Sequence, residues 1–168
     1  NYLYGSVDNY KKTNDSANVL DQALSLKFDT TGSAFPADGV YANRNFSTMD
    51  FSQHRELRFL LHSDKASSDV GTDFVLKVGT ESNYDKVIVP TNFDGWRLIS
   101  LKMVDSNGDG IADTLQDVSD ASYGVEVSQK RTSNGILNFQ EISMILAGVQ
   151  KQAGTSGNQG EVWLNVIH

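Results

Sequence analysis

The sequence contains no cysteine and only 2 prolines among its 168 residues, and its 14 basic residues are outnumbered by 21 acidic ones. The lack of cysteine excludes both a disulfide framework and a thiolate metal site. The net charge of −7 argues against nucleic acid as a partner, because clustered lysine and arginine side chains drive that binding. No apolar run approaches the roughly 18 residues of a membrane-crossing helix, so we predict that this segment does not span a membrane.

The remaining composition describes one folded domain over residues 1–168. A hydrophobic content of 39%, with 10% aromatic residues and 14 glycines, is typical of a folded chain and not of a disordered or collagenous one. Residues 1–19 are polar and lack a regular period, so we predict a lead-in segment in which residues 2–4 form at most a short edge strand. The chain opens on Asn1 without a signal peptide, and we expect it to be a piece of a longer protein.

Apolar and polar residues alternate with a period of two through much of the chain, which predicts short β-strands. The predicted strands cover 23–28, 39–46, 56–63, 73–80, 84–89, 96–103, 123–131 and 161–168. Residues 139–149 fit either a helical turn leading into a strand or a fully buried strand. Eight or nine short strands with scarcely any helix predict an all-β fold, a two-sheet antiparallel β-sandwich.

The most specific stretch is Asp105–Asp117, in which oxygen-bearing side chains recur at positions one, three, five and nine. A glycine at position six and a backbone carbonyl at position seven complete the spacing of a calcium-binding loop. Gln116 stands at position twelve, where an EF-hand loop has glutamate, and a late aspartate closes the shell in the dockerin and thrombospondin-type loops that this stretch resembles. The predicted Ca²⁺ ligands are Asp105, Asn107, Asp109, the carbonyl of Ile111, Asp113 and Asp117.

The same residues also fit a loop that binds no metal. Aspartate, asparagine and glycine favour solvated Asx turns with glycine at positive φ. If calcium binds, we expect the ion to fasten a long loop and not to act as a sensor or in catalysis. Such an ion is best used where calcium is plentiful, so the loop predicts an extracellular or cell-surface setting.

Several stretches together resemble the galactose-binding-like jelly rolls that are common among carbohydrate-binding modules. They are also similar to the repeated sandwich modules of SprA-type surface and secretion proteins of Bacteroidetes. These stretches are MDFS (49–52), LRFLLHS (57–63), FVLKVG (74–79), GWRLISL (95–101), EISMILAGV (141–149) and GEVWLNVI (160–167). The resemblance implies a jelly-roll sandwich at a bacterial cell surface. It implies either a sugar-binding appendage of a larger protein or a structural unit in a stack of domains.

Sugar binding requires an aromatic ring that stacks on a pyranose, with polar groups around it for the hydroxyls. Trp96 follows a glycine at a strand start and fits either a core position, as the resemblance implies, or a ligand contact. Trp163 fits either face of its strand. Tyrosines that share a strand face with polar residues are the other candidates. The predicted ligand-binding residues are Tyr41, Asn43, Tyr84, Lys86, Trp96 and Tyr123.

Catalytic patterns are missing. The glutamates show no legible pairing of the kind that sugar hydrolysis requires. The three histidines, His54, His62 and His168, lie near no Gly-x-Ser-x-Gly motif, and no two of them are four residues apart. We therefore predict a non-catalytic, calcium-stabilised extracellular binding module whose partner is a carbohydrate. The alternative is a structural or assembly module that contacts neighbouring domains of its parent protein and binds no small molecule.

Overall fold

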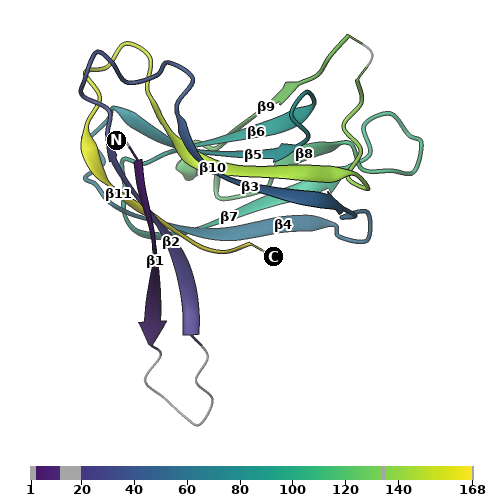
Figure 1. The fold of residues 1–168 in the computed structure, drawn as a ribbon, viewed down its shortest axis with the longest axis horizontal. Coiled ribbons are helices and arrows are strands. Elements are labelled where there is room, and N and C mark those ends of the chain that lie inside the picture. The colour runs from purple at the N-terminus through teal and green to yellow at the C-terminus, as the bar shows by residue number, and fades with distance from the viewer. Residues whose placement is uncertain (1–2, 12–19, 134, 168) are drawn as a thin grey trace.

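The computed structural model describes the backbone of residues 3–11, 20–133 and 135–167, and the side chains of 23–43, 47–133 and 135–165. Two antiparallel sheets pack against each other, as Figure 1 shows. This arrangement confirms the predicted all-β, two-sheet sandwich. The described residues contain a single short 3₁₀ helix, η1 (Ala121–Tyr123).

Each sheet combines strands that are far apart in the sequence. The six-stranded sheet has the order β1 (Leu3–Lys11), β2 (Leu20–Asp29), β11 (Gln159–Ile167), β4 (Glu56–Asp64), β7 (Asp94–Val104) and β8 (Thr114–Asp117). The five-stranded sheet has the order β3 (Val40–Met49), β10 (Ile142–Lys151), β5 (Thr72–Gly79), β6 (Tyr84–Pro90) and β9 (Glu126–Lys130).

The segment predicted as a lead-in contains a full edge strand. β1 pairs with β2 over nine residues, from Leu3 opposite Phe28 to Lys11 opposite Leu20. The two strands project beyond the body of the sandwich in Figure 1. An edge strand has a partner on one side only and needs little apolar alternation, which is why its polar sequence did not reveal it. Residue 2 of the expected short strand lies outside the described residues.

Two further predictions change. Residues 142–151 form strand β10, which is preceded by a turn in which the Glu141 N–H donates to the Asn138 carbonyl at 2.9 Å, so the strand begins later than the range 139–149 considered for it. The strand predicted over 123–131 is shorter, because Ala121–Tyr123 form a 3₁₀ turn that ends at Gly124 with φ of 64°. Strand β9 then begins at Glu126.

The core lies between the sheets and follows the predicted alternation. The six-stranded sheet contributes the buried side chains Leu57, Phe59 and Leu61 of β4 to this core. The five-stranded sheet contributes Phe74 and the other inward residues of β5. The rings of Phe59 and Phe74 meet across the interface with centroids 5.8 Å apart. Burying each such side chain contributes about 1.5–3 kcal/mol.

One edge of the sandwich is fastened by a buried ion pair. The Asp85 carboxylate, on β6, is fully buried and lies 2.5 Å from the Arg131 guanidinium. The same carboxylate accepts the backbone N–H of Leu115, on β8 of the other sheet, at 2.5 Å. Arg131 also donates to the Asp113 carbonyl at 3.0 Å. These contacts tie the two sheets together beside the Asp105–Asp113 loop.

Candidate binding faces

A row of aromatic side chains crosses the outer face of the six-stranded sheet. In the register of β11, β4 and β7, Trp163 lies opposite His62, and His62 lies opposite Trp96. The ring centroids of His62 are 4.9 Å from Trp96 and 5.3 Å from Trp163. We call these three residues the aromatic row. They face outward because the alternate positions of the same strands, such as Leu61 and Ile99, are buried in the core.

The structure resolves the alternatives for both tryptophans. Trp96 is 47% exposed, so the interpretation as a core residue is wrong. Gly95 lies opposite the buried Ser63, so the next residue, Trp96, lies on the outer face opposite His62. Trp163 lies on the same outer face, partly covered by its neighbours in the row.

Polar groups adjoin the row on its β2 side. The Ser25 hydroxyl, opposite Trp163, donates a hydrogen bond to the Glu161 carboxylate. The Asn165 side chain, two positions along β11 from Trp163, has a buried oxygen with no hydrogen-bond partner among the described residues. Leu60 lies opposite Asn165 and Leu98 lies opposite Leu60, and these two leucines are 36% and 47% exposed. The row therefore combines exposed apolar surface with polar groups at one end.

Four of the six predicted ligand residues gather on the outer face of the five-stranded sheet. On β3, Tyr41 and Asn43 occupy outward positions. On β6, Tyr84 and Lys86 do the same. Lys77 of β5 lies between these strands, with its ammonium 4.1 Å from the Tyr41 ring centroid and 5.2 Å from that of Tyr84.

Tyr41 is held in place by its surroundings. Its hydroxyl donates to the Asp38 carbonyl at 2.5 Å, and its ring lies beside Gly148 of β10. A side chain at Gly148 would collide with the Val40 carbonyl and the tyrosine ring, so only glycine fits there. Burial, helped by the nearby Tyr84 and Asp38, raises the pKa of Tyr41 to about 12. The hydroxyl therefore remains a neutral hydrogen-bonding group.

Tyr123 does not join either set. It ends η1, and its ring centroid lies 4.6 Å from the Arg97 guanidinium. Its carbonyl accepts a hydrogen bond from Arg97 at 3.5 Å. The predicted ligand residues thus fall into three places: Trp96 on one outer face, the Tyr41 group on the other, and Tyr123 apart from both.

The acidic loop after β7 folds as a tight turn around Asp105. Its carboxylate accepts backbone N–H groups from Gly108 at 2.6 Å, Asp109 at 3.2 Å and Gly110 at 2.8 Å. These donors hold the pKa of Asp105 below its ordinary value. Gly108 and Gly110 have φ of 81° and 88°, conformations that favour glycine. Asn107 donates to the Asp109 carboxylate at 3.2 Å, so the first three predicted calcium ligands share one turn.

The last two predicted ligands have hydrogen-bond partners of their own. Asp113 accepts the backbone N–H and the hydroxyl of Ser106 at 3.0 and 2.9 Å. Asp117 ends β8, about 10 Å along the strand from the loop, and accepts the Ser119 N–H at 3.0 Å. Nowhere in the described part of the chain do three or more His, Cys, Asp or Glu side chains form a group that could hold a metal. The oxygen chemistry suits calcium, but this conformation does not assemble a full shell.

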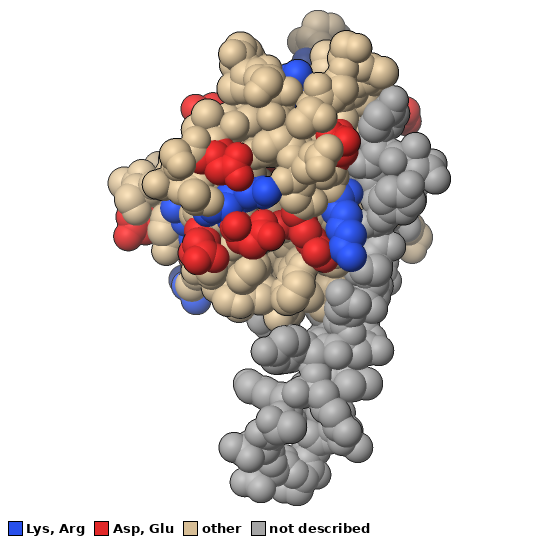
Figure 2. Space-filling view, turned by 90° about the vertical axis from the view of Figure 1, so that its left-hand side faces the viewer, with Lys and Arg blue, Asp and Glu red and all other residues tan. Residues whose placement is uncertain are grey.

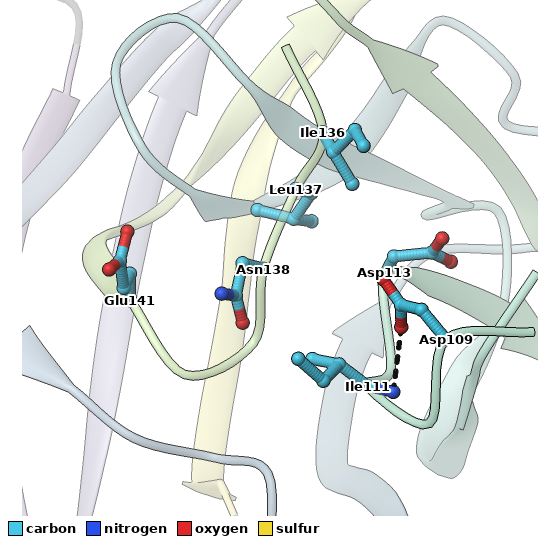
Figure 3. Close-up of a pocket in the computed structure, with 7 residues that line it drawn as sticks. All are labelled: Asp109, Ile111, Asp113, Ile136, Leu137, Asn138 and Glu141. Atoms are coloured by element: carbon cyan, nitrogen blue, oxygen red, sulfur yellow. Dashed lines mark hydrogen bonds between the residues drawn. The ribbon is translucent and has the colours of Figure 1, made fainter. Parts of the chain in front are cut away.

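A cavity of about 300 Å³ lies between this loop and the segment before β10. Figure 3 shows Asp109, Ile111 and Asp113 on one side, with Ile136, Leu137 and Asn138 facing them. Glu141 lies beyond Asn138 from the two aspartates. The dashed hydrogen bond from Ile111 N–H to Asp109 measures 2.8 Å. Glu141 is therefore set apart from the two aspartates that line this cavity.

Charges of both signs are interleaved on the side of the sandwich seen in Figure 2. Lys65 lies 3.6 Å from Asp69, and Lys27 lies 4.0 Å from Glu161. Exposed pairs of this kind contribute roughly 0–1 kcal/mol. Among the described residues of that side, acidic and basic side chains therefore lie next to one another.

No protein-family model matches the sequence, and neither curated proteins nor solved structures give a significant match. In the described ranges, no helix is long and apolar enough to cross a membrane. The assignment of a function therefore depends on the residues and surfaces described above.

Sequence reasoning had considered both tryptophans of the row as sugar-binding rings, but not His62 between them. His62 was considered only as a catalytic or zinc residue, and Lys77 and Lys130 were not considered at all. The outward positions of β4 and β5 carried the only available signal, since alternation places His62 and Lys77 opposite the core residues.

Proposed function

We propose that the domain is a non-catalytic carbohydrate-binding module of jelly-roll type, in an extracellular or bacterial cell-surface protein. The observation that carries this proposal is the aromatic row, in which Trp96 is half exposed on the outer face of the six-stranded sheet. An exposed indole presents an apolar surface on which the C–H face of a pyranose can stack. The carboxylate of Glu161 is an acceptor for sugar hydroxyls at the end of the row.

Binding of neutral polysaccharides tests this proposal. Affinity electrophoresis and calorimetry with xylan, mixed-linkage β-glucan and galactan would measure Kd for the native domain and for Trp96→Ala. We expect at least one of these polymers to bind, and the substitution to weaken its binding at least tenfold, or about 1.4 kcal/mol. Loss of the stacking ring is the cause, because Trp96 is half exposed and its removal leaves the core intact.

Two variants act as controls in that experiment. Trp96→Phe keeps an aromatic face and should retain part of the affinity. Tyr84→Ala removes a ring on the opposite outer face and should leave neutral-sugar binding unchanged. Failure of every polymer to bind, or equal binding by Trp96→Ala, would contradict a carbohydrate site at the aromatic row.

We further propose that Ca²⁺ binds the Asp105–Asp113 loop and stabilises it. Asp105, Asn107 and Asp109 supply side-chain oxygens from one turn, and the Ile111 carbonyl lies on the same loop. These hard oxygen donors are the ligands that calcium prefers. When bound, the ion would neutralise the carboxylates of the loop, whose only described partners are N–H and O–H groups.

Thermal unfolding in 5 mM CaCl₂ and in EDTA checks the calcium proposal. An ion at a hundredfold excess over Kd stabilises the folded state by about 2.7 kcal/mol, which raises the midpoint by roughly 5–10 °C for a domain of this size. Asp109→Asn keeps the loop's hydrogen-bond acceptor but removes a charge, and should abolish the rise. Asp117→Asn, on β8, should keep it. An unchanged midpoint for the native domain would leave the loop as a metal-free Asx turn.

The rival function is an assembly module. Leu60 and Leu98, exposed beside the aromatic row, extend it into an apolar strip that a neighbouring domain could cover. The polysaccharide measurements separate the two. An assembly surface predicts self-association of the native domain in sedimentation equilibrium, lost in Leu98→Glu, and no sugar binding.

A further inference from the structure

Three lysines lie together on the outer face of the five-stranded sheet. Lys77 on β5 is directly opposite Lys86 on β6, and Lys130 on β9 is directly opposite Tyr84. Like charges at opposed positions of a sheet destabilise it. We call Lys77, Lys86 and Lys130, with Tyr41 and Tyr84, the Tyr–Lys face.

The charge of these lysines is not neutralised within the described residues. None of the ion pairs found among those residues includes Lys77, Lys86 or Lys130. Burial and the neighbouring Lys86 and Lys130 lower the pKa of Lys77, and Asp38 only partly opposes them. Of the other carboxylates on this outer face, Asp73 accepts hydrogen bonds from Gln150 and Gln152, and Glu126 lies on β9 opposite Ile88. A chain with a net charge of −7 thus brings three lysines together on one face.

Aromatic and amide groups surround the lysines. Lys77 lies over the rings of both tyrosines, and Lys130 lies 5.6 Å from the Tyr84 centroid. Lys86 donates to the Gln150 amide oxygen at 2.7 Å, which leaves the Gln150 NH₂ on Asp73. Asn43 is exposed in the same cross-strand row as Lys77 and Lys86. The face offers cations for an anion, with rings and an amide beside them for a sugar.

We propose that the Tyr–Lys face binds anionic carbohydrate, a pyranose that carries a carboxylate or sulphate group. An anion at Lys77 and Lys86 relieves the repulsion between the two ammonium groups, and Asn43 hydrogen-bonds a hydroxyl. Nucleic acid is the less favourable polyanion, because the rest of the molecule is acidic and repels a dense line of phosphates. The sugar class extends the proposed function, whereas the face and its residues are independent of the aromatic row.

Calorimetry with oligogalacturonate, dextran sulphate and neutral dextran tests the inference at 50 and 300 mM NaCl. We expect the native domain to bind the two anionic polymers and not dextran, more weakly at high salt. Lys77→Gln/Lys86→Gln should lower their affinity at least tenfold. The matched control is Lys27→Gln/Lys102→Gln, which removes the same charge from exposed positions of the other sheet and should bind normally. Melting curves of each variant confirm that it is folded, and Lys77→Arg/Lys86→Arg, which keeps the charge, should retain most binding.

Each remaining outcome is decisive. Equal losses in the Lys27/Lys102 control would show general charge attraction and overturn the proposal. Tighter binding of a dT oligonucleotide than of oligogalacturonate would overturn it in favour of nucleic acid. Inorganic sulphate that binds as tightly as dextran sulphate would show a free-anion site without a sugar.

If Trp96→Ala abolishes neutral-sugar binding but leaves oligogalacturonate binding intact, the two faces are separate sites. If no neutral polymer binds while the lysine-dependent binding persists, the aromatic-row proposal fails and this inference stands.

Discussion

Replacing Asp85 with alanine will lower the free energy of unfolding by about 3–5 kcal/mol, the cost of removing one partner of a buried ion pair. The carboxylate is fully buried, 2.5 Å from Arg131, and accepts the Leu115 N–H from the other sheet. Its removal leaves a guanidinium without its counter-charge and a backbone donor without an acceptor. Urea unfolding followed by tryptophan fluorescence measures the loss.

The matched control is an exposed ion pair. Glu56 lies 2.6 Å from Arg58, but the two side chains are 29% and 54% exposed. Water screens such a pair, so Glu56→Ala should change the free energy of unfolding by less than about 1 kcal/mol. A loss at Asp85 no greater than that at Glu56 would contradict the view that the buried pair fastens the edge between β6 and β8.

The pH dependence of the same site has a defined sign. Burial raises the pKa of Asp85 above its ordinary value of 3.8, and outweighs Arg131 and the Leu115 N–H, which lower it. A raised folded-state pKa means that the folded protein binds the proton more tightly than the unfolded chain does. The stability from this linkage is therefore complete below pH 3.8 and is lost as the pH rises through the folded-state pKa. The unfolding free energy of the native protein minus that of Asp85→Asn should fall as the pH rises from 3.8 to the folded-state pKa of Asp85. Above that pKa the difference should stay constant.

Local alternation accounts for most of the fold that could be predicted. In β4 and β5, each second residue is apolar, and the structure buries those same residues, as with Leu61 and Leu76. The parts of the fold that the sequence did not predict also have local causes. β1 is a polar edge strand, and β8 has only four residues directly after a loop whose acidic pattern drew attention to metal. Asp117 was counted as a ligand by its spacing, whereas pairing with Leu101 placed it in a strand.

The binding faces depend on strand order, which alternation does not contain. His62, Trp96 and Trp163 belong to three strands that are distant in the sequence and become neighbours only because β4 lies between β11 and β7. The pairing of Lys77 with Lys86 depends less on strand order, because β5 and β6 form a hairpin around residues 80–83. The register that sets Lys77 opposite Lys86 follows from the length of that turn. Non-local pairing is thus the part of the site that sequence reasoning could not supply.

Phe59→Ala and Phe74→Ala will each lower the free energy of unfolding by about 3–5 kcal/mol, because each leaves a cavity as well as losing buried area. The two rings come from opposite sheets, are almost completely buried and lie with centroids 5.8 Å apart at an interplanar angle of 50°. Urea unfolding of both single variants and the double variant measures the losses and their coupling. We expect the double variant to lose less than the sum, since aromatic pairs add about 0.5–1.5 kcal/mol that either substitution already removes.

Leu98→Ala provides the comparison for this pair. Leu98 is 47% exposed on the outer face of β7, so its truncation leaves no cavity and should cost less than about 1 kcal/mol. Strict additivity of the two phenylalanine losses would mean that the rings do not interact across the sheets. Losses as small as that of Leu98→Ala would mean that the sheets do not pack through Phe59 and Phe74. Either result would contradict the sandwich interface on which both outward binding faces depend, because the alternation that buries these rings is what turns His62 and Lys77 toward solvent.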